Sequence, residues 1–324
     1  MNENNLSIKL AKVENTISEI KITLDLPEET TLEEIEANIV PEGERIIISE
    51  YGEHGSVKGL IFKNMETFPT NMFNFDPNIT SYTGDPFEDL ESITLSENFK
   101  TLPDKSWCFA NSKLKYINLK DTQITTVPYY FFSTAENLEI EELPDTITSL
   151  SASSAFQGCK KLKLKSLPKD LTNIGEYVFM MCENLMLTEL PPSLKTIGQR
   201  AFGYCKSLKA LRAFGVTLLS NSVFESCTGL VQISLPKIVT INSGVFSNCS
   251  NLKAVWIGAD INGISGNPFA NANKLTNIYI DLPRATVETK SFHSGFSGKI
   301  ICNDDEKFIT QEEFNAIDWE NYIV

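Results

Sequence analysis

The sequence has few of the residues on which enzymes and metalloproteins depend. It holds 2 histidines, His54 and His293, which lie far apart, and it has no Cys-x-x-Cys pair. Zinc sites and catalytic Cys-His pairs need such residues close together. A Gly-rich phosphate loop and a Gly-x-Ser-x-Gly turn are also missing. These absences favour a protein without catalytic residues, a cofactor or a bound metal.

Positive charge and long apolar runs are scarce as well. There are 42 acidic and 28 basic side chains, a net charge of −14, which disfavours nucleic acid as a partner because phosphates require Lys and Arg. No stretch reaches the roughly 18 to 20 apolar residues of a membrane helix, so membrane insertion is not expected. The first nine residues do not resemble a Sec signal peptide. This leaves open a virion component, a cytoplasmic protein, or a secreted protein with its leader removed.

The negative charge is concentrated in one part of the chain. Residues 1–100 hold 20 acidic and 7 basic side chains, and the remaining residues hold 22 and 21. An acidic N-terminal region is therefore followed by a nearly neutral region rich in Leu, Phe and Cys. The charge indicates a soluble N-terminal region and says little about what the rest of the chain binds.

Phenylalanine recurs with a nearly constant period after residue 86. The successive intervals are 22, 23, 24, 23, 23, 22, 22, 23 and 23 residues. A period of 20 to 29 residues centred on Leu-x-x-Leu-x-Leu is typical of a leucine-rich-repeat solenoid. The series is Phe87, Phe109, Phe132, Phe156, Phe179, Phe202, Phe224, Phe246, Phe269 and Phe292.

The repeats predict a mainly β solenoid of about nine coils of 22–24 residues. Short alternating runs such as residues 230–235 predict one strand per coil in a parallel sheet on the concave side. The Phe side chains are expected to stack as an aromatic spine inside the coils. We place the solenoid at residues 87–292, with an acidic N-terminal cap at 26–86 and a C-terminal cap at 293–324.

The repeat unit resembles the BspA-like, or Treponema-type, leucine-rich repeats. That unit reads Cys-x-x-Leu-x-x-Ile-x-Leu-Pro-x-x-Leu-x-x-Ile-Gly-x-x-Ala-Phe, and residues 185–208 follow it closely through Leu190-Pro191, Ile197-Gly198 and Ala201-Phe202. The matching positions are core positions, so the resemblance implies the fold more strongly than a function. It implies a protein of the bacterial or protist surface and adhesion type, or one from a bacteriophage tail or prophage region.

Five of the seven cysteines share one position in the repeat: Cys159, Cys182, Cys205, Cys227 and Cys249. We expect them to be small buried thiols beside the Phe spine, because stacked parallel coils do not offer disulfide geometry. Cys108 and Cys302 lie off this ladder and are not expected to form a disulfide. The acidic run 303–306 lacks the spacing of a calcium loop and predicts an acidic turn.

The first 25 residues carry a heptad pattern with apolar spacings of 4, 3, 4, 3 and 4. This pattern predicts a short helix with an a/d seam. Two interpretations are open: a coiled coil that joins two or three copies, or a helix that docks on its own domain. The seam residues are Leu6, Leu10, Val13, Ile17, Ile20 and Leu24.

The caps have their own local signals. Thr31-x-x-Glu34 predicts a helix over residues 32–38. Residues 44–49 and 57–62, with a turn at 52–55, predict a hairpin that covers the first coil. At the other end, Thr310-x-x-Glu313 predicts a short helix that carries Phe314 and closes the last coil.

Outward positions on the predicted strands are the candidates for ligand binding. Trp256 and Tyr279 lie 23 residues apart, on adjacent coils, and exposed aromatics on a rigid sheet suit a sugar or a protein side chain. The alternative is that these aromatics only cover neighbouring strand residues. The candidate ligand face comprises Tyr116, Arg212, Gln232, Trp256 and Tyr279.

A second outward pattern predicts ion pairs between coils. Glu139 and Glu141 precede Lys163 and Lys165 by 24 residues each, which favours pairing on a solvated face and a fixed coil register.

These observations support two hypotheses of function. The first is a non-enzymatic surface or adhesion protein that recognises protein or glycan. The second is a phage or prophage tail-associated structural or receptor-binding protein, oligomerised by residues 6–24. The second also rests on the C-terminal cassette, residues 278–286, 300–305 and 310–314, which is similar to the ends of repeat proteins from gut-bacterial prophage tail regions.

Overall fold

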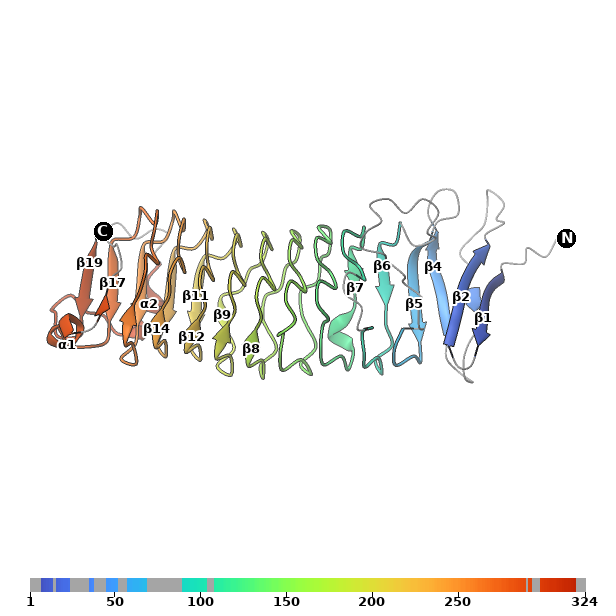
Figure 1. Cartoon of the computed structure of the whole chain (residues 1–324), viewed down its shortest axis with the longest axis horizontal. Helices are drawn as coiled ribbons and strands as arrows, with labels where there is room; N and C mark the ends of the chain where they lie inside the picture. The colour runs from blue at the N-terminus through green and yellow to red at the C-terminus, as the bar shows by residue number, and fades with distance from the viewer. Residues whose placement is uncertain are drawn as a thin grey trace.

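A solenoid occupies most of the described chain, and its coils follow one another along the longest axis of the molecule (Figure 1). The computed structural model describes residues 7–13, 16–23, 35–37, 45–51, 57–68, 89–103, 108–289, 291–292 and 298–318; side chains are described in these ranges from residue 58 onward, except at 291–292. The predicted fold class, a mainly β leucine-rich-repeat solenoid, is confirmed.

Two parallel six-stranded sheets run along the solenoid, where the sequence analysis predicted one strand per coil. The first has the order β19-β17-β15-β13-β11-β9 and the second β18-β16-β14-β12-β10-β8. The first sheet consists of β9 (Glu189–Leu190), β11 (Ala210–Ala213), β13 (Gln232–Leu235), β15 (Ala254–Ile257), β17 (Asn277–Ile280) and β19 (Lys299–Cys302). The second consists of β8 (Asn173–Ile174), β10 (Thr196–Ile197), β12 (Leu218–Leu219), β14 (Thr240–Ile241), β16 (Gly263–Ile264) and β18 (Ser291–Phe292).

The predicted hairpin is confirmed and begins the stack of coils. In the order β3-β4-β5-β6-β7, the strands β3 (Ile35–Ala37), β4 (Arg45–Tyr51) and β5 (Val57–Lys63) pair antiparallel. β5 then pairs in parallel with β6 (Ser92–Thr94), which pairs with β7 (Tyr116–Ile117). The parallel ladder therefore reaches upstream of residue 87, into the predicted cap. The predicted helix over 32–38 is wrong at residues 35–37, because these pair with residues 46–48 of β4.

The predicted N-terminal helix is also wrong. β1 (Ser7–Val13) and β2 (Thr16–Thr23) form an antiparallel hairpin with Leu10 opposite Ile20 and Ile8 opposite Ile22. The same residues carry a period-2 alternation rich in β-branched side chains, which favours strands and competes with the heptad pattern. Of the predicted seam, Leu10, Val13, Ile17 and Ile20 lie in these strands, and Leu6 and Leu24 lie outside the described residues.

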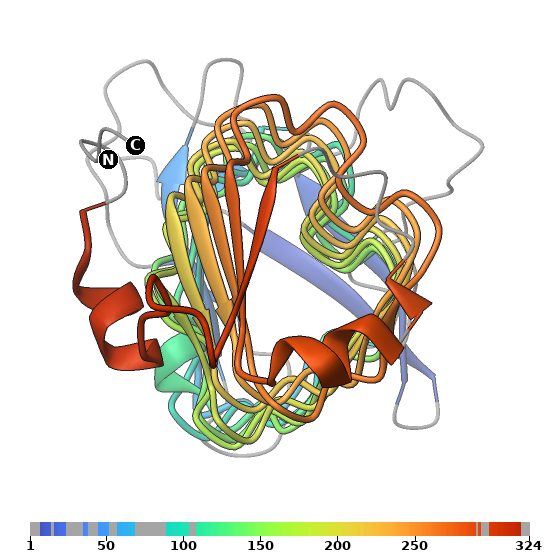
Figure 2. The same cartoon turned by 90° about the vertical axis from the view of Figure 1, so that its left-hand side faces the viewer.

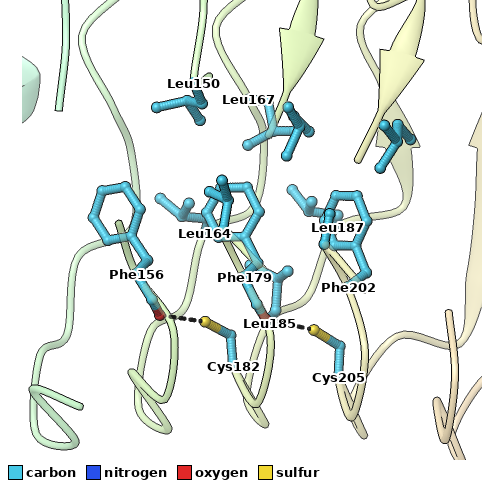
Figure 3. Close-up of a cluster of buried hydrophobic side chains, with 14 of the residues drawn as sticks. Leu150, Phe156, Leu164, Leu167, Phe179, Cys182, Leu185, Leu187, Phe202 and Cys205 are labelled. Atoms are coloured by element: carbon cyan, nitrogen blue, oxygen red, sulfur yellow. Dashed lines mark hydrogen bonds between the residues drawn. The ribbon is translucent and has the colours of Figure 1, made fainter. Parts of the chain in front are cut away.

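The predicted aromatic spine is confirmed. Eight Phe rings from consecutive coils stack with centroids 5.4–5.9 Å apart and interplanar angles of 2–19°. Figure 3 shows three of them beside the leucines of the same coils. The spine residues are Phe109, Phe132, Phe156, Phe179, Phe202, Phe224, Phe246 and Phe269.

Tight corners flank the spine. In most coils the residue two positions after the Phe has a positive φ, as at Asn111, Thr134, Met181 and Tyr204. This left-handed conformation costs a non-Gly residue about 1–2 kcal/mol, so packing of the coil must hold it in place. The Ile-Gly pairs require glycine for a different reason, which is close contact between backbones. A Cβ on Gly198 would lie 2.6 Å from the amide nitrogen of Glu176 in the preceding coil.

Three elements complete the C-terminal end. α1 (Arg284–Thr289) follows β17, β19 is the last strand of the first sheet, and α2 (Gln311–Ala316) follows it. The remaining element, η2 (Leu119–Asp121), is a 3-10 turn that follows β7 nearer the N-terminal end of the solenoid. Figure 2, viewed along the solenoid, shows α2 outside the stacked strands of the first sheet. The helix thus lies on a face of the solenoid, whereas the sequence analysis expected it to close the last coil.

Candidate binding surface

The outward side of the solenoid, along the first sheet and the coils that precede it, divides into two parts. Each coil has a buried inward residue at the centre of its segment on this side, such as Ile117 or Leu211. One outward residue precedes this central residue, and one follows it. We call the twelve N-terminal positions the open face, because none of them is buried, and the six C-terminal positions the covered face, because all of them are buried. The open face consists of Ser92, Thr94, Tyr116, Asn118, Glu139, Glu141, Lys163, Lys165, Met186, Thr188, Ala210 and Arg212; the covered face consists of Gln232, Ser234, Ala254, Trp256, Asn277 and Tyr279.

Three residues of the predicted ligand face are not available to a ligand. Gln232, Trp256 and Tyr279 are 6%, 4% and 5% exposed. Trp256 and Tyr279 do lie side by side on paired strands, as their spacing predicts. The prediction that they are exposed is wrong, because the chain's own C-terminal segment covers them.

Specific contacts hold this segment on the sheet. The indole Nε1 of Trp256 donates to the carbonyl of Ile309 (3.1 Å), and the ring of Tyr279 packs edge-on against Phe314 with centroids 5.9 Å apart. Gln311 Nε2 donates to Ser234 Oγ (3.2 Å). Phe314 is fully buried. Trp256, Tyr279 and Phe314 form, with Ala254 and Ile301, a small apolar cluster on the outside of the sheet, distinct from the core within the coils.

The residues of its first turn fix where α2 begins. Thr310 accepts from the backbone N–H of Glu313 (3.2 Å), and Glu313 accepts from the N–H of Thr310 (2.7 Å), which completes the predicted capping box. The capping box satisfies helix N–H groups that would otherwise lack partners. A six-residue helix is too short to be stable alone, so burial of Phe314 supplies the rest.

The open face retains two large exposed apolar side chains. Tyr116 and Met186 are each 48% exposed. Arg212, the other predicted residue on this face, is half-buried and pairs with Glu189 at 3.4 Å. Met186 was missed by the sequence reasoning, although its position after the anchor Leu185 is equivalent to that of Glu139 and could have revealed it.

Ion pairs between neighbouring coils occupy the centre of the open face. The predicted pairs are confirmed: Lys163 Nζ lies 2.7 Å from Glu139 Oε2, and Lys165 Nζ lies 2.5 Å from Glu141 Oε2. The hydrogen bond from each lysine lowers the pKa of its glutamate. These pairs are exposed and contribute little stability. They fix the order of charge along the face.

The repeat cysteines offer no reactive group. Each thiol donates to the carbonyl oxygen of the spine Phe in the preceding coil, at 3.0–3.1 Å. Figure 3 shows the bonds from Cys182 and Cys205. Burial raises the pKa of all five thiols, so the nucleophilic thiolate is suppressed at neutral pH. The five ladder cysteines are buried thiols, as predicted, and Cys108 and Cys302 are buried thiols as well.

The acidic turn at 303–306 has an internal partner. Asp305 Oδ2 lies 2.6 Å from Arg284 Nη2 and accepts from the N–H of Cys302 (2.7 Å). The hydrogen bond from Arg284 lowers the pKa of Asp305. Within the described part of the chain no group of three or more His, Cys, Asp or Glu could hold a metal ion. His54 and His293 lie outside the described residues.

Comparison with known families identifies this architecture. The sequence profile of the BspA type leucine-rich repeat region matches residues 62–186 and 187–297, in 6 copies. The chain belongs to this family. Membership of this BspA-type family indicates a role in binding other molecules, and the family is not known for catalysis.

Solved leucine-rich-repeat proteins are similar in fold. One from Treponema pallidum is 21% identical with a TM-score of 0.42, over 78% of this chain and 96% of that one. One from Bacteroides ovatus is 21% identical with a TM-score of 0.36, over 82% and 90%. A leucine-rich cell surface protein from Faecalibacterium prausnitzii is 15% identical with a TM-score of 0.34, over 91% and 100%. A search of curated proteins gives no match.

Proposed function

We propose that this BspA-type protein is a non-enzymatic binding protein of the surface or adhesion type, and that its open face takes the ligand. The ligand is a protein or a glycan presented on another surface. The two parts of this outward side of the solenoid carry the proposal: one is already occupied by the chain's own helix, and the adjoining part is left uncovered.

The chemistry of the open face supports recognition. Tyr116 and Met186 supply exposed apolar area, and aromatic residues and Met are enriched in protein interfaces. Between them the paired glutamates and lysines have no net charge, so the face does not select for a highly charged polymer. A preorganised stack of coils also loses little conformational entropy on binding.

An array experiment tests the proposal. The chain is applied to an array of purified surface proteins and glycans beside the double variant Tyr116→Ala/Met186→Ala. We expect the variant to lose at least about tenfold in affinity for the bound spots, since each truncated interface anchor costs on the order of 1 kcal/mol or more. Its melting temperature should not change, because both side chains are exposed.

Tyr129→Ala is the matched control. Tyr129 is 53% exposed, in the turn that precedes the spine residue Phe132 and away from the open face. The control should bind like the unmodified chain. Equal binding by all three proteins would refute the choice of the open face.

A tail-associated role in a bacteriophage or prophage is the second candidate. The C-terminal cassette, which spans β17, α1, β19 and α2, supports it by resemblance alone, since the N-terminal residues expected to form a helix form strands. Immunogold labelling of purified virions with an antibody to the solenoid would test it. Labelled tails would support this role, and unlabelled virions would exclude it.

A further inference from the structure

The open face has an ordered chemistry along the solenoid. On either side of their central inward residues, its four central coils present, in sequence, an apolar, an acidic, a basic and an apolar step; the first coil also exposes Lys115, which pairs with Glu91 at 2.5 Å and lies beside Glu139. Both outward residues of the second coil are acidic and both of the third are basic. The steps are Tyr116 with Asn118, Glu139 with Glu141, Lys163 with Lys165, and Met186 with Thr188.

The spacing of these steps matches an α-helix. The backbones of these coils hydrogen-bond to one another, a contact that holds paired strands about 4.8 Å apart, and the spine rings of these coils repeat every 5.4–5.7 Å. An α-helix rises 5.4 Å per turn. A helix laid along the solenoid therefore presents residues i, i+3 or i+4, i+7 or i+8, and i+11 to four successive coils, with an accumulated mismatch of about 2 Å at most.

The protein already uses this mode of contact on the adjoining coils. α2 places Phe314 against Tyr279 and Gln311 against Ser234, so a short amphipathic helix lies across the outward residues of β13 and β17. Figure 2 shows this helix against the outer side of the strands. The open face continues from β11 at the edge of this covered part.

We infer, on the basis of the proposed function, that the open face binds an amphipathic α-helix of a partner protein. The helix lies along the solenoid next to α2. It carries an apolar residue at each end, against Tyr116 and Met186. Between these it presents Lys or Arg to Glu139 and Glu141, and Asp or Glu to Lys163 and Lys165.

Two helical peptides of equal composition test the inference. The block peptide has Leu at i and i+11, Lys at i+3 and i+4, and Glu at i+7 and i+8. The mixed peptide has Lys and Glu at i+3 and i+4, and Glu and Lys at i+7 and i+8. Both carry the same hydrocarbon staple on the opposite side. The mixed peptide cannot match the charges of the face in either direction. We therefore expect the full chain to bind the block peptide about tenfold more tightly than the mixed peptide. Because the preference depends on exposed charges, 1 M salt should remove it.

The exchange Glu139→Lys/Lys163→Glu makes the test specific. It retains an ion pair of reversed sign at positions 139 and 163, so folding should be preserved, and it breaks the acidic and basic blocks. The preference for the block peptide should disappear. The control exchange Glu136→Lys/Lys160→Glu, at a pair 2.6 Å apart outside the open face, should keep it.

Each remaining outcome overturns the inference. Equal binding of both peptides, or a preference that survives the 139/163 exchange, would refute helix recognition. A dimer in light scattering that excludes the block peptide would assign the face to a second copy of the chain. If neither peptide binds but array binding still depends on Tyr116 and Met186, the helix is excluded and the proposed function stands. If neither peptide binds and array binding does not depend on Tyr116 and Met186, both the helix inference and the proposed function are rejected.

Discussion

Individual side chains of the repeat have interlocking roles. Cys205 donates to the carbonyl of Phe179, and the ring of Phe179 stacks on that of Phe202. The sequence predicted both the Phe spine and the buried thiols, because each falls on one position of a strict period. It could not predict that the thiol links a coil to the one before it. That bond depends on how closely the backbones approach, which spacing alone does not contain.

The buried thiols make stability sensitive to alkaline pH. Burial raises the pKa of each ladder thiol in the folded state above its usual value of 9.0, so the unfolded chain loses these protons first as pH rises. Stability is therefore complete below about pH 9 and falls above it, by up to about 1.4 kcal/mol per pH unit for each thiol.

Urea unfolding at pH 7.5, 9 and 10 measures this loss. The variant Cys205→Ala/Cys227→Ala should lose less stability between pH 9 and pH 10 than the unmodified chain. Identical losses in the two proteins would show that the ladder thiols are not the cause.

Close backbone approach also fixes certain glycines. A Cβ on Gly258 would collide with the carbonyl oxygen of Pro236 in the preceding coil, whereas a Cβ on Gly203 would meet no atom nearer than 3.4 Å. We expect Gly258→Ala to destabilise the protein by about 1–3 kcal/mol, as overpacking does, and Gly203→Ala to have little effect. Thermal unfolding of the two variants compares them, and equal melting temperatures would contradict the packing of these coils.

At the scale of secondary-structure elements, local sequence patterns predicted some elements correctly and conflicted at others. The capping box at Thr310 predicted α2 correctly, but not its place on the sheet. The outward strand positions of Trp256 and Tyr279 predict that both side chains are exposed, but the segment that covers them is distant in sequence, as the bond from Trp256 to Ile309 shows. Residues 7–23 carry both a heptad and an alternating pattern, and the strands formed.

Disruption of α2 should expose Trp256 without unfolding the solenoid. In a chain with Trp107→Phe and Trp319→Phe, the variant Phe314→Ala should shift Trp256 fluorescence to longer wavelength and increase its quenching by acrylamide. The cause is that Phe314 belongs to the outer cluster and not to the main core. Thr310→Ala should act in the same direction but more weakly, through a loss of about 1 kcal/mol at the cap.

Glu312→Ala is the control for this prediction. Glu312 is an exposed residue of α2 outside the capping box. It should leave the fluorescence unchanged. Unaltered fluorescence in Phe314→Ala would show that α2 does not protect Trp256.

At the scale of the whole molecule, the solenoid is a chain of coils that contact their neighbours. Periodicity predicted this architecture, since each coil must bury its apolar side against the next. The sequence did not predict the division between open and covered faces. Both parts have outward polar and aromatic residues, and only the C-terminal segment distinguishes them.

Removal of residues 1–25 should leave the solenoid intact. Within the described residues, β1 and β2 pair only with each other, in a sheet separate from those of the coils. We expect the truncated chain to keep the melting temperature of the full chain. Its mass in light scattering should fall only by the mass of the residues removed. A trimer that becomes a monomer on truncation would restore the coiled-coil hypothesis.

Site-specific photo-crosslinking tests the central claim most directly. Benzoylphenylalanine is placed at Tyr116, at Met186 or at Tyr129 in the full chain, and each protein is irradiated with the protein ligand that binds most tightly on the array. The account predicts crosslinks to that ligand from positions 116 and 186, which lie on the open face, and none from position 129. Crosslinks from position 129 alone would contradict it.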